Sequence, residues 1–198
     1  MLKRRQVIGT VFSAAALSIL PVSAQNARKG IIVVYSRTGN TLELAQRIHE
    51  KTGYQILRLQ LVKPYAENYN DMTYLARDEI RSDARREIAT EIPNLSAYTD
   101  IYVGGPYWWG ALDVPMRTFL KDHPLDSKRV HPFITSGSSS PRGEVEDIRR
   151  LCPKATIEPY FYSSSSEVPS ALNKLDKWIE ESQSLNNILS SRMSLELA

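Results

Sequence analysis

A regular alternation of short apolar runs with amphipathic runs, beginning at residue 31, is the feature of this sequence that most constrains its fold. The runs "IIVVY" (31–35) and "DIYVGG" (100–105) are typical of buried strands that are covered on both faces. Between them, "TLELAQRIHEKTG" (41–53) carries apolar residues at helical spacing and ends at Gly53, where a C-cap glycine belongs. This alternation predicts an α/β domain of three layers, built on a doubly wound five-stranded parallel sheet.

The remaining elements follow from the same patterns. Strands are expected at 31–35, 54–61, 100–105, 129–137 and 155–162, and helices at 41–53, 70–88, 113–120, 143–151 and 168–179. In the second strand, apolar and polar residues alternate, which predicts a strand at the edge of the sheet. Asp113 is expected to cap the third helix. Pro132 weakens the prediction of the fourth strand, which we keep because the proline lies near the strand's start. Beyond a domain that spans 30–182, residues 183–198 are expected to form a short helix or a C-terminal tail.

Residues 1–24 have the features of an export signal. The basic start "MLKRR" precedes an apolar stretch, 7–20, and "PVSAQ" offers small residues for cleavage after Ala24. The pair Arg4-Arg5 resembles a twin-arginine signal, with general secretion as the alternative. The apolar stretch is shorter than the roughly 20 residues that a membrane span requires. We therefore expect a protein exported to the periplasm or the extracellular space, with no stable membrane span once the signal is removed.

Charge and cysteine content exclude several classes of function. Without residues 1–24 the chain has 22 basic and 22 acidic residues, which argues against a nucleic-acid partner because such proteins carry a basic surface. The single cysteine, Cys152, excludes an intramolecular disulfide. The three histidines form no metal-binding pattern with cysteine, and no nucleophile motif of a hydrolase occurs. We therefore assign no metal ligand and no catalytic residue.

The segment "SRTGNT" (36–41) directly follows the first strand and opens the first helix. Free backbone N–H groups and the positive end of the helix dipole favour an anion at such a place. The hydroxyls of Ser36, Thr38 and Thr41 add donors, and Gly39 lets the backbone turn closely around a tetrahedral group. The segment has no lysine and no Walker pattern, so it suits a phosphate that is held rather than transferred. A plain helix cap without a ligand is the alternative.

Two further loops follow the third and fourth strands, and both are expected at the edge where ligands of parallel sheets bind. In "GPYWWG" (105–110), three adjacent aromatic residues cannot all enter one core. We expect one tryptophan to pack inside and at least one aromatic side chain to face a planar ligand. The loop "SGSSSPRG" (136–143) offers polar groups and backbone donors, with a simple linker as the alternative. Together the three loops describe a site for a phosphate that carries a planar heterocycle.

In these motifs the chain resembles the flavodoxin-like family. "YSRTGNT" is similar to the family's phosphate loop, "GGPYWWGALDVPMRTFL" to its second flavin loop, and "PFITSGSSS" to its third. The resemblance is strongest to a branch with a P-x-W-W-G loop and a P-Y-x-x-x-Y segment, matched by Pro64, Tyr65 and Tyr69. It covers about residues 30–182 and implies strand order 2-1-3-4-5 and bound FMN. The implied cofactor-binding residues are Ser36, Arg37, Thr38, Gly39, Asn40 and Thr41 for the phosphate, Pro106, Tyr107, Trp108, Trp109 and Gly110 for the ring faces, and Ser136, Gly137 and Ser138 for the polar edge of the ring.

The chain departs from the family in two respects. Its third loop has three serines, a proline and Arg142 where many relatives are rich in glycine. Typical flavodoxins are strongly acidic and cytosolic, whereas this chain is neutral without residues 1–24 and has the features of an export signal. The resemblance implies an exported FMN protein that transfers electrons to an unknown partner protein or small acceptor. The alternatives are an FMN-dependent NAD(P)H:quinone-type oxidoreductase and a non-redox binding module that kept the fold, because the fold alone does not decide function.

Overall fold

The computed structural model of the protein describes residues 29–137 and 142–196, with 185–196 described by their backbone only. The predicted signal at 1–24 lies outside these residues. In chain order the elements are β1 (Gly30–Val34), α1 (Asn40–Thr52), β2 (Gln55–Arg58), α2 (Tyr69–Arg81), a 3-10 turn (Leu95–Ala97), β3 (Asp100–Trp108), β4 (Ala111–Leu112), α3 (Val114–Asp122), β5 (Arg129–Ser136), α4 (Arg142–Leu151), β6 (Thr156–Ile157), β7 (Phe161–Ser164) and α5 (Val168–Glu196).

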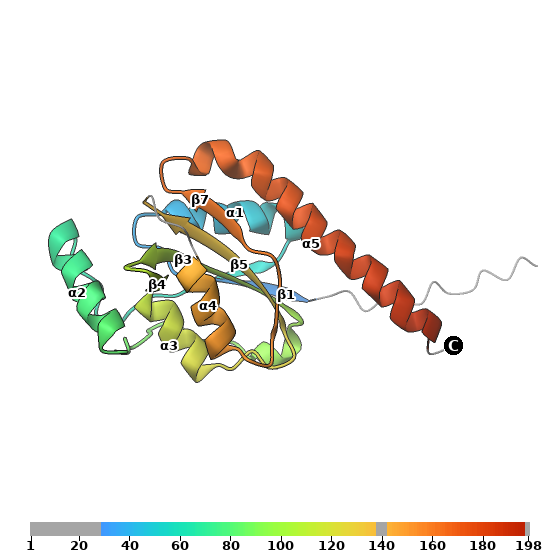
Figure 1. The fold of residues 1–198 in the computed structure, drawn as a ribbon, viewed down its shortest axis with the longest axis horizontal. Coiled ribbons are helices and arrows are strands. Elements are labelled where there is room, and N and C mark those ends of the chain that lie inside the picture. Colours follow the sequence, from blue (N-terminus) through green and yellow to red (C-terminus); the bar gives the residue numbers. More distant parts are fainter. Residues whose placement is uncertain (1–28, 138–141, 197–198) are drawn as a thin grey trace, which may run out of the picture.

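A parallel sheet forms the middle layer, in the order β2-β1-β3-β5, with β6 and β7 both beside β5. Successive residues of β1 point to opposite faces of this sheet. Ile32 and Val34 pack with α1 and α5, whereas Ile31 and Val33 pack with α3 and α4. Figure 1 shows the two helical layers on either side of the strands. The predicted fold class is confirmed, and the predicted edge strand is β2, which pairs only with β1 among the described strands.

The predicted fifth strand is divided into β6 and β7, and Pro132 in β5 explains the division. The carbonyl of Val130 accepts a hydrogen bond from the backbone of Glu158, so this carbonyl faces the fifth-strand side. In a parallel strand the backbone groups of residues i and i+2 point toward the same neighbouring strand, so those of Pro132 point to the same side as those of Val130. Proline has no N–H to donate to that neighbour. Pro132 lies between the segment of β5 that pairs with β6, 129–130, and the segment that pairs with β7, 133–136. The proline is therefore tolerated inside the sheet because the neighbouring strand is interrupted there.

The second helix is shorter than its charged sequence predicts, since α2 ends at Arg81. Asp83 follows in the left-handed region, with a φ of 53° that stops the helix. Its carboxylate is held by two cations of α3, at 2.6 Å from Arg117 and 2.7 Å from Lys121. The prediction of a helix to residue 88 is therefore wrong, because these contacts with α3 turn the chain away from the helix axis. Figure 1 shows α2 beyond the edge where the strands end.

The last helix, α5, is the longest of the described elements and packs its first half on the sheet. Val168, Leu175 and Ile179 are buried, and Leu172 is partly buried, as the helical spacing predicts. The helix continues through Glu196. Among the helices that the structure describes, none combines the length and the apolar character that a membrane crossing requires.

Gly104 of β3 provides a test of how tightly the sheet packs. A Cβ built on Gly104 would lie 2.0 Å from the ring of Phe133, whereas one built on Gly137 meets no atom within 4 Å. We expect Gly104→Ala to lower the free energy of unfolding by about 1–3 kcal/mol, because the aromatic ring must move in a packed core. Gly137→Ala should change it by less than about 0.5 kcal/mol. Urea unfolding of the two purified variants measures both, and equal stabilities would contradict this packing.

Candidate functional site

The three predicted loops meet at one edge of the sheet because they follow three neighbouring parallel strands. Val34 of β1 is in register with Gly104 of β3, and the N–H of Tyr35 donates to the carbonyl of Gly104 at 3.0 Å. Pro106 is in register with Thr135 at the end of β5. The chain runs from β1 to β2 on one side and then to β3 on the other, so the strand order reverses at β1. Ligands of open α/β sheets bind beyond the strand ends at such a reversal.

The first loop ends in a helix start that no side chain caps. Helix α1 has Gly39 as its N-cap residue, with a φ of 100° and a ψ of −24°, and no side-chain hydrogen bond closes the cap. The hydroxyl of Ser36 accepts from the N–H of Gly39 at 3.2 Å, which leaves its own proton available to donate. Backbone N–H groups of the first helical turn therefore point out of the helix end without side-chain partners among residues 29–137 and 142–184. This arrangement fits a phosphate group.

The other residues of this loop divide between buried and exposed positions. Thr41 is buried, and its hydroxyl lies 2.7 Å from that of Thr135, which ties the helix start to β5. The guanidinium of Arg37 donates to the backbone carbonyls of Ala66 and Glu67, so its hydrogen bonds lead away from the helix end. The predicted residues Thr38 and Asn40 are exposed and partly buried, respectively. The loop thus offers hydroxyl and backbone donors, while its one cation is bound elsewhere.

The second loop is a β-hairpin, which the sequence analysis did not predict. β3 extends through Trp108, and β4 pairs back with it, with Tyr107 opposite Leu112 and Trp108 opposite Ala111. The tip residues Trp109 and Gly110 have φ values of 50° and 85°. Positive φ at both tip residues is the pattern of a type I′ turn, which matches the twist of the paired strands. The hairpin holds the aromatic residues on a short rigid ribbon at the end of β3.

The two tryptophans of this hairpin have different surroundings. Trp108 packs edge-on against Tyr35 and Tyr65, with ring centroids 5.9 and 5.3 Å apart. Trp109 is 50% exposed, and its indole N–H donates to the carbonyl of Thr73 in α2 at 2.7 Å. The guanidinium of Arg77 lies 5.8 Å from the Trp109 ring centroid. One tryptophan therefore fills the interior, and the other presents a ring to the surface beside the strand ends.

The third loop is described at its two ends, 136–137 and 142–143. The hydroxyl of Ser136 lies 2.9 Å from that of Tyr162 in β7, and the Ser136 carbonyl accepts from the N–H of Ser165 at 2.7 Å. Gly137 is exposed, and Ser138 lies outside the described residues. The backbone of this loop therefore leaves the end of β5 on the same side as the first two loops.

A cavity of about 520 Å³ lies beside the first loop. Its lining comes from three segments and includes Tyr35, Ser36, Arg58, Gln60 and Tyr65. The volume falls within the range of about 300–1,000 Å³ that is usual for small-molecule sites. Arg58 was not predicted as a site residue, and its charge makes this side of the first loop suitable for an anionic group.

Two buried carboxyls lie beside Gly105 of β3, at the starts of α3 and α4, and were not recognised as a site in the sequence. Asp113 caps α3 as predicted, accepting from the N–H of Met116 at 2.9 Å, and Glu144 lies in the first turn of α4. Both are at most 1% exposed. Burial raises the pKa of Asp113 to about 8. Burial, together with the nearby charge of Asp113, raises the pKa of Glu144 well above its usual range.

The sequence profile of the family described as Flavodoxin matches residues 29–182. A candidate flavoprotein from Bacteroides uniformis ATCC 8492 is 24% identical, with a TM-score of 0.68, and the alignment covers 77% of this chain and 98% of that one. A flavoprotein in complex with FMN from Lactobacillus acidophilus NCFM is 21% identical, with a TM-score of 0.61 and coverage of 72% and 97%.

These solved structures share the fold of the domain. A candidate flavoprotein from Bacteroides eggerthii DSM 20697 is also similar, at 22% identity and a TM-score of 0.62, with 74% of this chain and 97% of that chain covered. Among curated proteins, none matches this sequence. The family profile spans well over half of the chain and includes all three loops described above. The chain therefore belongs to the flavodoxin family.

Proposed function

We propose that this protein binds FMN at the carboxyl edge of its sheet and transfers electrons, and that it does so after export from the cytoplasm. The observation that carries the proposal is the start of α1, where Gly39 leaves backbone N–H groups without a side-chain cap at the reversal of strand order. The FMN complex of the Lactobacillus flavoprotein supports the choice of cofactor, since the two chains share their fold.

The residues of the site fit the two parts of FMN. The segment 36–41 would hold the phosphate through backbone N–H groups and the hydroxyls of Ser36 and Thr41. The hairpin 106–110 would flank the ring, and the loop from Ser136 would meet its polar edge. When bound, FMN supplies the redox chemistry, and the chain binds it, orients it and excludes water from it.

A substitution in the first loop should affect the binding of the FMN phosphate and leave the binding of the flavin ring unchanged, so the two contributions can be measured separately. We expect Gly39→Ala to weaken FMN binding at least about tenfold, or about 1.4 kcal/mol, because a side chain is strained at a φ of 100° and the loop must shift. The affinity for riboflavin, which lacks the phosphate, should stay within about twofold. Fluorescence titration of the apoprotein with each flavin measures both constants.

Gly53→Ala is the matched control, since Gly53 lies at the other end of the same helix with a φ of 71° and open space around it. Both variants should lose about 1 kcal/mol of stability, because both place a Cβ in the left-handed region. Only the Gly39 variant should lose FMN affinity. Equal FMN affinity in the two variants would show that the phosphate is not held at this helix end, and absence of flavin binding in the folded wild type would refute the cofactor itself.

Electron transfer and NAD(P)H oxidation are distinguished by steady-state kinetics. We expect the FMN-loaded protein to be reduced by dithionite and to pass electrons to an added acceptor. Its oxidation of NADH or NADPH in the presence of a quinone should not exceed that of the same concentration of free FMN. Sustained turnover well above free FMN would instead support the NAD(P)H:quinone-type oxidoreductase.

Export is tested with the pair Arg4-Arg5. We expect the wild-type chain in a Gram-negative host to reach the periplasm and to begin at Gln25 after cleavage. The double variant Arg4→Lys and Arg5→Lys keeps the charge and should leave the uncleaved chain in the cytoplasm, because the twin-arginine route reads the arginines themselves. Fractionation and N-terminal sequencing give the answer. Export of the double variant would favour general secretion, and retention of the wild type would refute the signal.

A further inference from the structure

Asp113 and Glu144 bring three carboxyl oxygens together without hydrogen-bond partners in the described part of the chain. These atoms are Oδ2 of Asp113 and both Oε atoms of Glu144. A Cβ built on Gly105 would lie 2.1 Å from Oδ2 of Asp113 and 3.4 Å from Oε1 of Glu144. Both side chains therefore converge on one point beside the backbone of β3, and their oxygens are no farther apart than these two distances together. The side chains are 0% and 1% exposed, respectively.

Such a pair does not hold two negative charges. An ionised carboxylate that is buried without a partner costs several kcal/mol, and a second charge nearby adds repulsion. A single proton held by the pair removes one of the two charges and with it the repulsion between the groups. The three unpartnered oxygens are the arrangement expected where protons, rather than cations of the protein, neutralise the pair.

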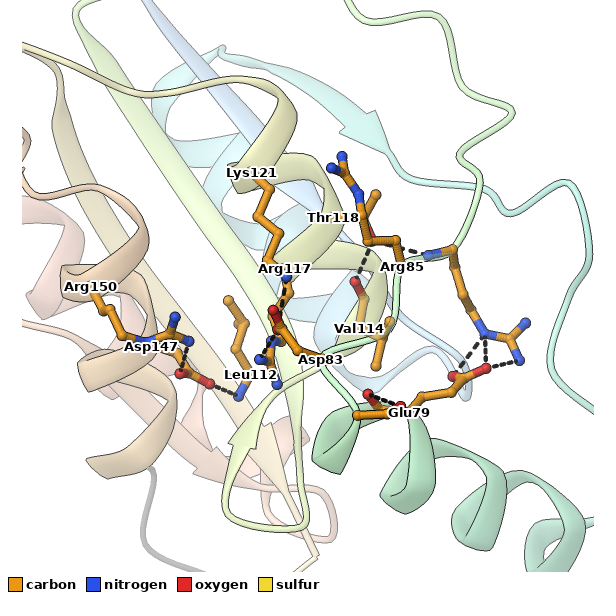
Figure 2. A network of polar contacts seen from close by, with 12 residues as sticks. Glu79, Asp83, Arg85, Leu112, Val114, Arg117, Thr118, Lys121, Asp147 and Arg150 are labelled. Carbon is orange, nitrogen blue, oxygen red and sulfur yellow. Dashed lines mark hydrogen bonds and ion pairs between the residues drawn. The ribbon is translucent and has the colours of Figure 1, made fainter.

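The charged and titratable groups around the pair do not replace this proton. From α3, Arg117 favours the ionised form of Asp113, but its guanidinium donates to Asp83 at 2.6 Å. From α4, the charge of Asp147 opposes ionisation of Glu144. Asp147 itself accepts from the N–H of Leu112 and from Arg150, as Figure 2 shows.

Tyrosines are the other titratable residues close to the pair. The hydroxyl of Tyr107, on the hairpin, would lie 3.5 Å from a Cβ built on Gly143, beside Glu144. Two buried tyrosines also pack against Trp108 from other segments. Tyr35 follows β1, and Tyr65 belongs to the connection between β2 and α2. Burial is the main cause that raises the pKa of both phenols, and the charge of Asp113 raises each further. Neutral phenols supply no compensating positive charge to Asp113.

The pair lies where the hairpin meets α4. Gly143, next to Glu144, packs so closely on the hairpin tip that a Cβ there would lie 2.0 Å from the carbonyl oxygen of Gly110. The hydrogen bond from the N–H of Leu112 to Asp147, at 3.1 Å, joins the same two elements a few residues away. Figure 2 shows this contact between β4 and α4. Repulsion between Asp113 and Glu144 would therefore act directly on the junction of the second and third loops.

We propose that Asp113 and Glu144 share a proton that holds the hairpin against α4, so that FMN binds tightly only while the pair keeps this proton. Both are positioning residues, since they act through the loops that flank the ring. The inference rests on the proposed FMN site. Beyond the proposed function, it states that the affinity for FMN depends on a proton held by Asp113 and Glu144, which lie outside the phosphate loop.

The sign of the linkage follows from where the proton is held. The folded chain binds a proton that the unfolded chain releases, because the carboxyl pKa values are raised on folding. The contribution of this pair to the stability of the apoprotein is therefore fully present at and below the usual carboxyl range of about pH 4, and it is lost as the pH rises toward the pKa of about 8 of Asp113. Above the pKa of the pair, FMN must bind together with one proton. Its affinity then falls about tenfold for each pH unit.

The decisive experiment compares FMN affinity across pH 7 to 9.5 in the wild-type chain and in Glu144→Gln. Glutamine keeps the shape and a hydrogen-bond donor for Asp113 but cannot ionise. We expect the wild type to lose about tenfold or more in affinity over this range and the Gln variant to lose less than about threefold. Glu146→Gln on the exposed face of α4 is the matched control and should follow the wild type.

An infrared spectrum of the wild-type apoprotein at pH 7 adds a readout that needs no flavin. A protonated carboxyl band in the wild type that disappears in Glu144→Gln supports the shared proton. If the wild type shows no such band, the shared proton is refuted. FMN binding with the same pH profile in wild type and Glu144→Gln overturns the link to the cofactor. Failure of the proposed function looks different, because no FMN would then bind to any variant at any pH. Should the Gln variant not fold, the wild-type pH profile decides alone, and a flat profile refutes the proposal.

Discussion

Parallel pairing of β1 with β3, and of β3 with β5, decides where every candidate functional group of this protein lies. In a parallel sheet the carboxyl ends of neighbouring strands share one edge, and both faces must be covered by helices. The segments after Val34, Trp108 and Ser136 are therefore brought together although they are far apart in the sequence. The buried faces of β1, which pack on helices of both layers, hold this arrangement in place. The site depends on the sheet more than on any single side chain within it.

Features that depend on neighbouring residues could be predicted from the sequence. The strand at 31–35, the helix that ends at Gly53 and the cap at Asp113 each have a local signal, and each is present in the structure. The helix start at Gly39 belongs to the same class, because a strand followed by small hydroxyl residues and a helix places free N–H groups in a known direction. For this reason the uncapped helix start at 36–41 could be predicted from the sequence alone.

Features that depend on distant contacts could not be predicted. The length of α2 is decided by Asp83, which binds cations of α3, and the break between β6 and β7 is decided by Pro132 on another strand. The hairpin at Trp109 was missed because Trp109-Gly110 is not one of the Asn-Gly, Asp-Gly or Gly-Gly pairs that signal a type I′ turn, although both residues have positive φ values in the structure. Glu144 looked like an ordinary residue at a helix start, and only the fold brings it to Asp113.

The charges of the site explain why the buried pair matters to its chemistry. The segment 36–41 holds its candidate ligand with neutral hydroxyls and backbone groups, and its one cation, Arg37, is bound to carbonyls of 66 and 67. An anionic cofactor therefore meets little compensating charge from this loop, while Asp113 and Glu144 lie buried beside Gly105 of β3. If both carboxyls were ionised, they would repel each other and the cofactor in a region of low dielectric constant, where such repulsion is strong. Arg117 favours the ionised form of Asp113 but is bound to Asp83, so the pair depends on its proton for neutralisation. The protonation of this pair and the binding of an anion therefore favour one another.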